Sequence, residues 1–202
     1  MKTSRIAVVA VGFGAAVLAA RASALALGDA MPAANVTLTG VDGREVSLAQ
    51  EAGKKGTLVI FSCNHCPWVK AWQDRLVTLG NTYSSRGIGV VLVNSNDPKA
   101  YPDDDLPTMR ELAREKGYAF PYVMDTTSAV GRAFGATHTP EAFLFDASGR
   151  LVYHGTIDDN ARDPGEVQHA YLRDALDAVV AGAKPQIQET KALGCSIVFR
   201  GK

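Results

Sequence analysis

The amino-acid sequence predicts an α/β domain with a mixed central sheet, and three observations lead to that prediction. A continuous apolar run, Thr57–Phe61, is followed by apolar residues at helical spacing and by a second apolar run, Ile88–Val93. This strand–helix–strand order is typical of two parallel strands buried on both faces. Further along, Glu141–Gly155 indicates two apolar strands around Ser148-Gly149, a hairpin that adds antiparallel strands to the sheet.

The first elements of the chain follow from their own patterns. The segment Asn35–Leu48 alternates apolar and polar residues around Asp42-Gly43, which predicts a hairpin because this pair tolerates the positive φ angles of a tight turn. The helix between the two buried strands should end before Gly87. Its apolar face consists of Trp68, Val69, Trp72, Leu76, Leu79 and Tyr83.

The second half of the chain predicts a loop, three helices and a terminal strand. Asn94–Pro107 is rich in Asn, Asp and Pro and indicates a loop, after which helices are expected from Thr108 to Gly117 and from Thr126 to Phe134. The last helix should open at Asp163–Glu166, where a cap, a proline and an acidic residue follow one another, and should bury Val167, Tyr171, Leu176 and Val179. The tail, Cys195–Phe199, is short and apolar enough for an added edge strand.

The N-terminus has the parts of a secretory signal peptide. Lys2 and Arg5 precede an uncharged apolar run, Ile6–Ala20, and the small residues around Ala26 form an A-x-A cleavage site. The run has 15 residues, which is short of the roughly 20 that a membrane-spanning helix needs. We therefore expect a signal peptide over residues 1–26 and one domain over residues 27–202, which is periplasmic or secreted rather than membrane-anchored.

The net charge of the chain without residues 1–26 disfavours two classes of binding partner. Cleavage after Ala26 would leave 18 basic and 21 acidic residues, a slight negative excess that argues against nucleic acid or an anionic membrane as a partner of the mature form. The three cysteines, Cys63, Cys66 and Cys195, are too few for a disulfide-stapled scaffold. They are therefore available for chemistry.

The stretch FSCNHCPW, Phe61–Trp68, is the strongest functional signal. Cys63 and Cys66 should lie in the opening turn of the helix, where free N–H groups and the macrodipole lower the pKa of a thiol. His65 adds a cation beside Cys63 that would favour the reduced state and make the protein a stronger oxidant, and Pro67 suits the first helical turn. The spacing predicts a redox-active dithiol.

Two cysteines at this spacing could also attach haem, bind zinc or copper, or form a structural disulfide. Haem attachment requires a histidine immediately after the second cysteine, where Pro67 stands, and a zinc site would need a second pair of ligands. A purely structural bridge would close only a two-residue loop and gain little chain entropy. A copper-binding chaperone that uses Cys63, Cys66 and His138 remains an alternative, because thiolates suit Cu(I).

The Cys-x-x-Cys at a strand-to-helix junction, followed by THTPEAFLFDASGRLVYHGTIDD, resembles the thioredoxin superfamily in its AhpC/TSA-like redoxin branch. The likeness covers about residues 30–202 and implies a thioredoxin-like fold with an N-terminal hairpin and flanking helices. It also implies that Thr139-Pro140 is a cis peptide facing the dithiol, with the Thr139 backbone open to an incoming peptide. Cys63 would be the exposed nucleophile and Cys66 the resolving thiol.

The sequence also departs from that family. The buried carboxylate of thioredoxins is replaced by Thr57. Glu141, beside the expected cis-proline, is a candidate proton acceptor for Cys66 but is better interpreted as an ordinary exposed acid at a strand end. Peroxiredoxins carry a threonine three residues before the reactive cysteine, where this chain has Ile60 or Cys63. Cys195 is either a third redox thiol or an apolar residue of the terminal strand. His138 either tunes the dithiol or is a polar loop residue. His154 and His169 are expected to be structural or to face solvent.

The sequence therefore predicts an exported thiol–disulfide oxidoreductase that acts on protein thiols, needs no dissociable cofactor or metal, and works with a redox partner that the sequence does not identify. A thiol peroxidase that uses the same dithiol is the enzymatic alternative. The direction of exchange, the client and the oligomeric state are not encoded in any motif that we recognise.

Overall fold

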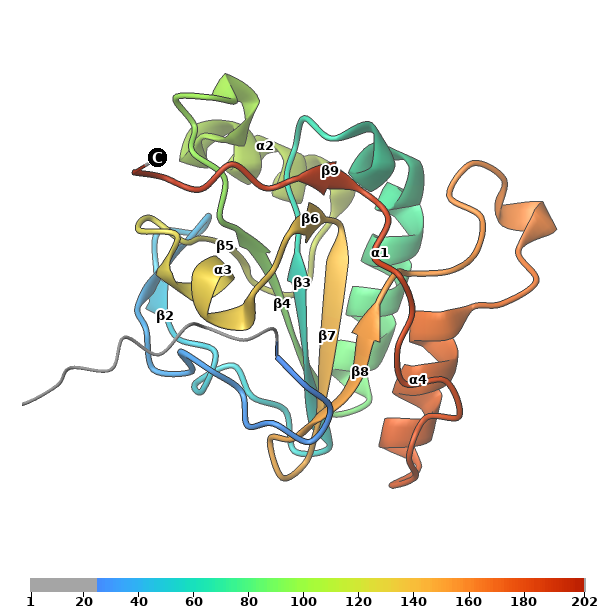
Figure 1. Ribbon diagram of the computed structural model, residues 1–202. Helices are drawn as coiled ribbons and strands as arrows, with labels where there is room; N and C mark the ends of the chain where they lie inside the picture. The colour runs from blue at the N-terminus through green and yellow to red at the C-terminus, as the bar shows by residue number, and fades with distance from the viewer. Residues whose placement is uncertain (1–24, 202) are drawn as a thin grey trace, which may run out of the picture.

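The computed structural model describes residues 25–201, and its centre is a seven-stranded mixed sheet in the order β2-β1-β5-β4-β3-β7-β8 (Figure 1). The parallel centre pairs β3 (Gly56–Phe61) with β4 (Ile88–Asn94), and β4 with β5 (Tyr122–Met124). Antiparallel strands flank it: β1 (Leu38–Gly40) and β2 (Glu45–Val46) on one side, β7 (Glu141–Asp146) and β8 (Leu151–Gly155) on the other. The expected α/β class and mixed sheet are confirmed.

Alternate side chains of the central strands enter two separate cores, as the period of two in a strand requires. One face carries Leu58 and Ile60 of β3 and is covered by α1 (Pro67–Ser85), α2 (Leu106–Lys116) and α4 (Tyr171–Val180). The other face carries Val59 and Phe61 and is covered by α3 (Ala129–Phe134) and the N-terminal segment. Because β3 is buried on both faces, the loop that follows it starts from a fixed position.

Most of the expected elements are confirmed, including the N-terminal hairpin, the two buried strands and the hairpin around Ser148-Gly149. Gly117 and Gly135 end α2 and α3 with positive φ angles of 67° and 66°, a conformation that costs glycine no Cβ clash. The strand β5 was not expected, because three residues between Pro121 and Asp125 carry too short a pattern.

The expected start of the last helix is wrong. Pro164–Glu166 forms only a 3-10 turn, with the Asp163 carboxylate accepting from Gly165 N–H, and Val167 is extended. The carboxylate of Asp159 then accepts from the amides of Gln168 and His169, and α4 begins only at Tyr171. These local side-chain acceptors satisfy the backbone amides that a continuous helix would have used.

The C-terminal tail crosses the end of the sheet at which β3 gives way to α1 (Figure 1). It forms β9 (Cys195–Ser196), which pairs antiparallel with β6 (His138–Thr139) in a separate two-stranded sheet. The tail is therefore a strand, as expected, although it does not extend the central sheet.

Between Leu25 and Gly201, the structure contains no helix with the length and apolar character needed to cross a bilayer. The expected signal peptide falls on residues 1–24, which lie outside the described residues, and on the two residues that follow them.

Candidate active site

The cysteines of the Cys-x-x-Cys motif lie in the loop between β3 and α1. Cys66 is the N-cap of α1, and Pro67 takes one of its first positions, where a missing N–H costs nothing. Cys63 lies upstream of the cap, so the expectation that both thiols belong to the opening helical turn holds only for Cys66. Both side chains are 0% exposed, and the expectation that Cys63 is an exposed nucleophile is wrong.

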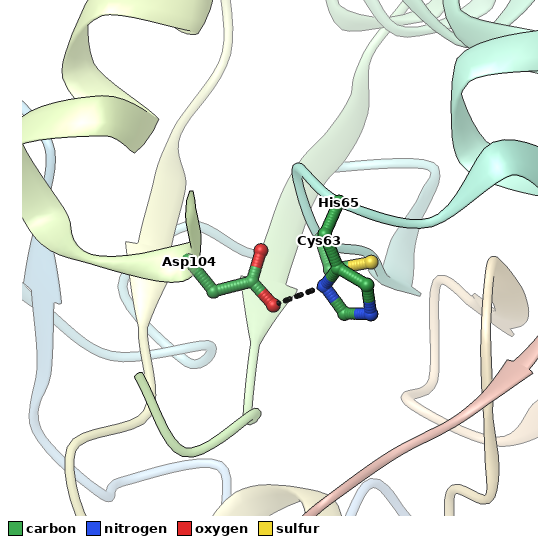
Figure 2. A group of neighbouring side chains, drawn as sticks. All are labelled: Cys63, His65 and Asp104. Carbon is green, nitrogen blue, oxygen red and sulfur yellow. Dashed lines mark hydrogen bonds and ion pairs between the residues drawn. The ribbon is translucent and has the colours of Figure 1, made fainter. Parts of the chain in front are cut away.

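A buried carboxylate, Asp104, holds this loop in place. Its Oδ2 lies 2.8 Å from Nδ1 of His65 (Figure 2). The same oxygen lies 3.0 Å from Nδ2 of Asn96, and Oδ1 accepts from the backbone N–H of Asn64 at 2.7 Å. Asp104 is 0% exposed, and the His65 ring stacks on Tyr101 with centroids 3.7 Å apart. The two residues between the cysteines are thus fixed by a carboxylate 40 residues away in the sequence.

Sequence reasoning missed this carboxylate. Asp104 lies in the segment interpreted as a polar loop, and nothing in the local pattern distinguishes it from the exposed Asp103 beside it. One signal could have found it. The backbone N–H groups of the loop after β3 are buried and need hydrogen-bond acceptors, which a nearby carboxylate can provide. Asn64 has two further partners, since its side chain accepts from Tyr122 Oη and donates to the Asp103 carbonyl.

The opposite wall of the site is the turn before β7. Thr139-Pro140 is a cis peptide, as the family resemblance implied. The Oγ1 atom of Thr139 lies 3.1 Å from Cys63 Sγ, and its carbonyl oxygen lies 3.1 Å from Cys66 Sγ, within donating distance of the Cys66 thiol. One residue of this turn therefore contacts both sulfurs.

The third cysteine completes the site. Cys195 is paired through the β6–β9 backbone with Thr139, and its Sγ lies 2.7 Å from Sγ of Cys66. It is partly exposed, whereas the other two cysteines are fully buried. Cys66 thus contacts both the Thr139 carbonyl and the Cys195 sulfur, and Thr139 also contacts Cys63.

The electrostatics favour a thiolate on Cys66. The hydrogen bond from the Cys63 thiol lowers the pKa of Cys66 to about 4, and the Cys195 thiol and the amides of Val69 and Cys195 reinforce it against the effect of burial. The same bond to Cys66, together with burial, raises the pKa of Cys63. Burial and the bond to Cys66 raise the pKa of Cys195 to about 11. The pKa is therefore lowered at Cys66, whereas at Cys63 its direction is opposite to the expected one.

Glu141 is not the exposed acid that the sequence indicated. It is 2% exposed, and it accepts from the amides of Thr137 and His138 through Oε2 and from His154 Nε2 through Oε1. Burial alone would raise the pKa of Glu141, but these bonds hold it below the ordinary value. Glu141 therefore shapes the turn that carries the cis peptide, and His154 is structural as expected.

The other candidate side chains are placed as follows. Within residues 25–201, the ligand-type atoms gathered within 4.8 Å of one another belong to Cys63, His65 and Asp104. His138, expected as a copper ligand in one alternative, instead bonds Thr137 Oγ1 through Nδ1. His65 lies near Cys63, as expected. Its Nδ1 is hydrogen-bonded to Asp104, so a metal ion bound by Nδ1 would have to break that bond.

The Redoxin family model matches residues 26–171, which include β1 to β8 and the dithiol loop. The chain belongs to the Redoxin family. A crystal structure of an uncharacterized conserved protein from Geobacillus kaustophilus shares 37% identity with this redoxin, with a TM-score of 0.81 over 88% of this chain and 94% of that one. A thioredoxin-like protein in its oxidised form matches at 23% identity with a TM-score of 0.59 over 77% and 98% of the two chains, which shows the thioredoxin-like fold.

Among curated proteins, the redoxin is similar to the thiol-disulfide oxidoreductase ResA of Halalkalibacterium halodurans. The two are 26% identical over 120 residues, which cover 59% of this chain and 64% of that protein. The match therefore spans less than two thirds of the relative.

Proposed function

We propose that this redoxin is a thiol–disulfide oxidoreductase in which Cys66 is the attacking thiolate and Cys63 its resolving partner. The observation that carries the proposal is the position of Cys66 at the N-cap of α1, with Thr139 in contact with the sulfurs of both Cys63 and Cys66. Exchange proceeds only through a thiolate, and a sulfur with a low pKa is also the better leaving group. The similarity to thiol-disulfide oxidoreductases named ResA supports the same reaction class.

In the reducing direction, the Cys66 thiolate attacks one sulfur of a substrate disulfide, a Cys66–substrate bond forms, and the other substrate sulfur leaves as a thiolate. Cys63 then gives its proton to solvent and attacks Cys66 Sγ, which forms the Cys63–Cys66 disulfide and releases the second substrate sulfur as a thiolate that takes up a proton. The substrate gains two electrons and the dithiol loses two. The oxidising direction is the reverse sequence.

Asp104, His65 and Thr139 position the two sulfurs in this scheme. The carboxylate of Asp104 fixes the residues between the cysteines, and Thr139 Oγ1 can donate to or accept from the Cys63 thiol. The negative charge of Asp104 also adds to the raised pKa of Cys63, after the bond to Cys66 and burial. Cys63 is thereby kept protonated until its proton is removed for resolution.

The experiment is turnover of a peptide disulfide by the reduced protein, with Ser196→Ala as the matched control because Ser196 is exposed and lies next to Cys195. We expect Cys66→Ser to lose turnover, and Cys63→Ser combined with Cys195→Ser to stop at a mixed disulfide between Cys66 and the substrate. Undiminished turnover by Cys66→Ser would falsify the proposal. A parallel assay with hydrogen peroxide tests the peroxidase alternative, for which Cys66 should be oxidised much faster than free cysteine.

Export is part of the proposal. An oxidising compartment is where structural and exchange disulfides persist, and residues 1–26 have the composition of a secretory signal. N-terminal sequencing of the protein recovered from a bacterial periplasm should begin at Leu27. Recovery of the intact chain from the cytoplasm alone would contradict export and leave the dithiol chemistry to be judged separately.

A further inference from the structure

The C-terminal strap, Gly194–Arg200, lies where a client peptide is expected to bind. The resemblance to thioredoxins implies that the backbone of Thr139 pairs with an incoming peptide, yet in this chain Thr139 already pairs with Cys195. The pairing places the Cys195 thiol against Cys66, with 2.7 Å between the sulfurs. The strap thus occupies the peptide position with a cysteine of its own.

The strap is anchored along its length. Ile197 N–H donates to the Thr137 carbonyl at 3.0 Å, Val198 N–H donates to Asn96 Oδ1 at 2.8 Å, and the Val198 carbonyl accepts from Asp97 N–H at 2.7 Å. A client that paired with Thr139 would have to break these bonds first. Cys63 and Cys66 are fully buried, whereas Cys195 is partly exposed, so Cys195 is the residue of the three that lies nearest to solvent.

We infer that Cys195 is a third catalytic thiol of this redoxin, which exchanges disulfides with Cys66 inside the site and with thiols of other molecules outside it. The inference rests on the proposed function of the Cys63–Cys66 dithiol and adds the route by which that buried pair communicates with solvent.

The internal step is balanced without any co-reactant. Cys195 loses its proton and attacks Cys66 Sγ of the Cys63–Cys66 disulfide; the Cys66–Cys195 bond forms, the Cys63–Cys66 bond breaks, and Cys63 leaves as a thiolate that takes up a proton. The sulfurs of Cys66 and Cys195 need to approach by roughly 0.7 Å to reach the about 2.05 Å of a disulfide bond. The protein contains one disulfide before and after the step.

The external step uses a thiol of another molecule. That thiolate attacks Cys195 Sγ, a mixed disulfide forms at Cys195, and Cys66 leaves as a thiolate. A second external thiolate then attacks the external sulfur of the mixed disulfide, an external disulfide forms, and Cys195 leaves as a thiolate. Attack at Cys195 is favoured because Cys195 is the partly exposed cysteine and because Cys66, whose pKa is about 4, is the better leaving group.

Disulfide mapping of the full-length protein in glutathione buffers tests the inference. We expect Cys63→Ser to form an intramolecular Cys66–Cys195 disulfide throughout the population, and wild type to contain both this bond and Cys63–Cys66. If Cys63→Ser keeps Cys66 and Cys195 as thiols in a buffer that fully oxidises Cys195→Ser to Cys63–Cys66, the inference is overturned.

A register variant provides the matched control. Cys195→Ser combined with Ser196→Cys keeps three thiols but moves one to the next strand position, whose side chain points to the other face. In the Cys63→Ser background this variant should lose the disulfide to Cys66, and a variant that still forms it would contradict the role of Cys195. Its urea unfolding midpoint, compared with wild type, separates loss of the thiol from loss of the fold.

Gly194→Ala perturbs the strap without removing a thiol. A Cβ at Gly194 would lie 2.2 Å from the Thr139 carbonyl oxygen and 2.6 Å from its carbon, so the strap must move away from β6. We expect less Cys66–Cys195 disulfide and faster alkylation of Cys66 than in wild type. An unchanged disulfide distribution would contradict the inferred geometry.

Turnover separates this inference from the proposed function. With an external thiol as reductant, Cys195→Ser should lose most of its turnover while still forming Cys63–Cys66. If Cys66→Ser is inactive and Cys195→Ser is as fast as wild type, the dithiol function stands and the role of Cys195 fails. If Cys66→Ser keeps full turnover, both fail.

Discussion

Replacing Asp104 by asparagine changes the carboxylate that orders the dithiol loop while keeping its size. Asparagine retains one oxygen for the Asn64 amide but presents an NH₂ group towards His65 Nδ1 and Asn96 Nδ2. His65 can switch tautomer and accept from that group, whereas the Asn96 amide faces a second donor and loses its acceptor. A buried donor left without a partner costs about 1–3 kcal/mol.

The corresponding shift is measurable by urea unfolding of the reduced protein. With an m-value of about 2 kcal/mol per M, the midpoint should fall by roughly 0.5–1.5 M. Asp103→Asn is the matched control, since Asp103 is exposed and contacts Asn64 through its backbone carbonyl, which the substitution keeps. The control should change stability by about 0.5 kcal/mol or less.

The same variant has a chemical readout. The bond to Cys66 and burial raise the pKa of Cys63 most, and the negative charge of Asp104 adds to them. Asp104→Asn should therefore lower the pKa of Cys63, as measured by alkylation at different pH values. If Asp104→Asn and Asp103→Asn unfold at the same urea concentration, the carboxylate does not hold the loop as described.

Three further predictions concern pH and the core. In the reduced protein, the free energy of unfolding of wild type relative to Cys66→Ser should rise from about pH 4 to pH 9.0, the ordinary pKa of a cysteine. In that range the unfolded state holds the Cys66 proton and the folded state does not. A difference in unfolding free energy that does not change with pH would argue against the thiolate. Glu141 has a lowered pKa, so its stabilisation is present above about pH 4.5 and lost below it, and acid unfolding curves of Glu141→Gln should lack this loss. Trp72→Phe removes the indole that donates to Asp158 Oδ1 at 2.7 Å and leaves a cavity, so thermal unfolding should report a loss of about 2 kcal/mol or more; a change below about 0.5 kcal/mol would mean that this bond adds nothing.

Much of the fold could be predicted because its signals are local. The continuous apolar runs of β3 and β4 are long enough to be distinguished from turns, and glycines with positive φ mark the ends of α2 and α3. The cysteine spacing and the strand-to-helix junction identified the site, and the Thr-Pro pair identified its opposite wall through a resemblance. These features depend on neighbours within a few residues.

The rest of the site depends on contacts between distant segments. Asp104 is 40 residues from Asn64, and the sulfur of Cys195 is 129 residues from that of Cys66, so no local pattern reports either contact. The burial of Glu141 has the same origin, since amides of the preceding turn and His154 on the next strand surround it. The contact of Cys195 also helps to lower the pKa of Cys66, after the larger effect of Cys63, and the sequence does not report it.

Residue-resolved alkylation of the reduced protein as a function of pH tests the account most directly. Mass spectrometry after brief alkylation reports how the thiolate fraction of each cysteine changes with pH. We expect Cys66 to titrate near pH 4, far below the ordinary cysteine value, while Cys63 and Cys195 remain protonated at neutral pH. Titration of Cys66 at an ordinary value, or of Cys63 before Cys66, would contradict the account.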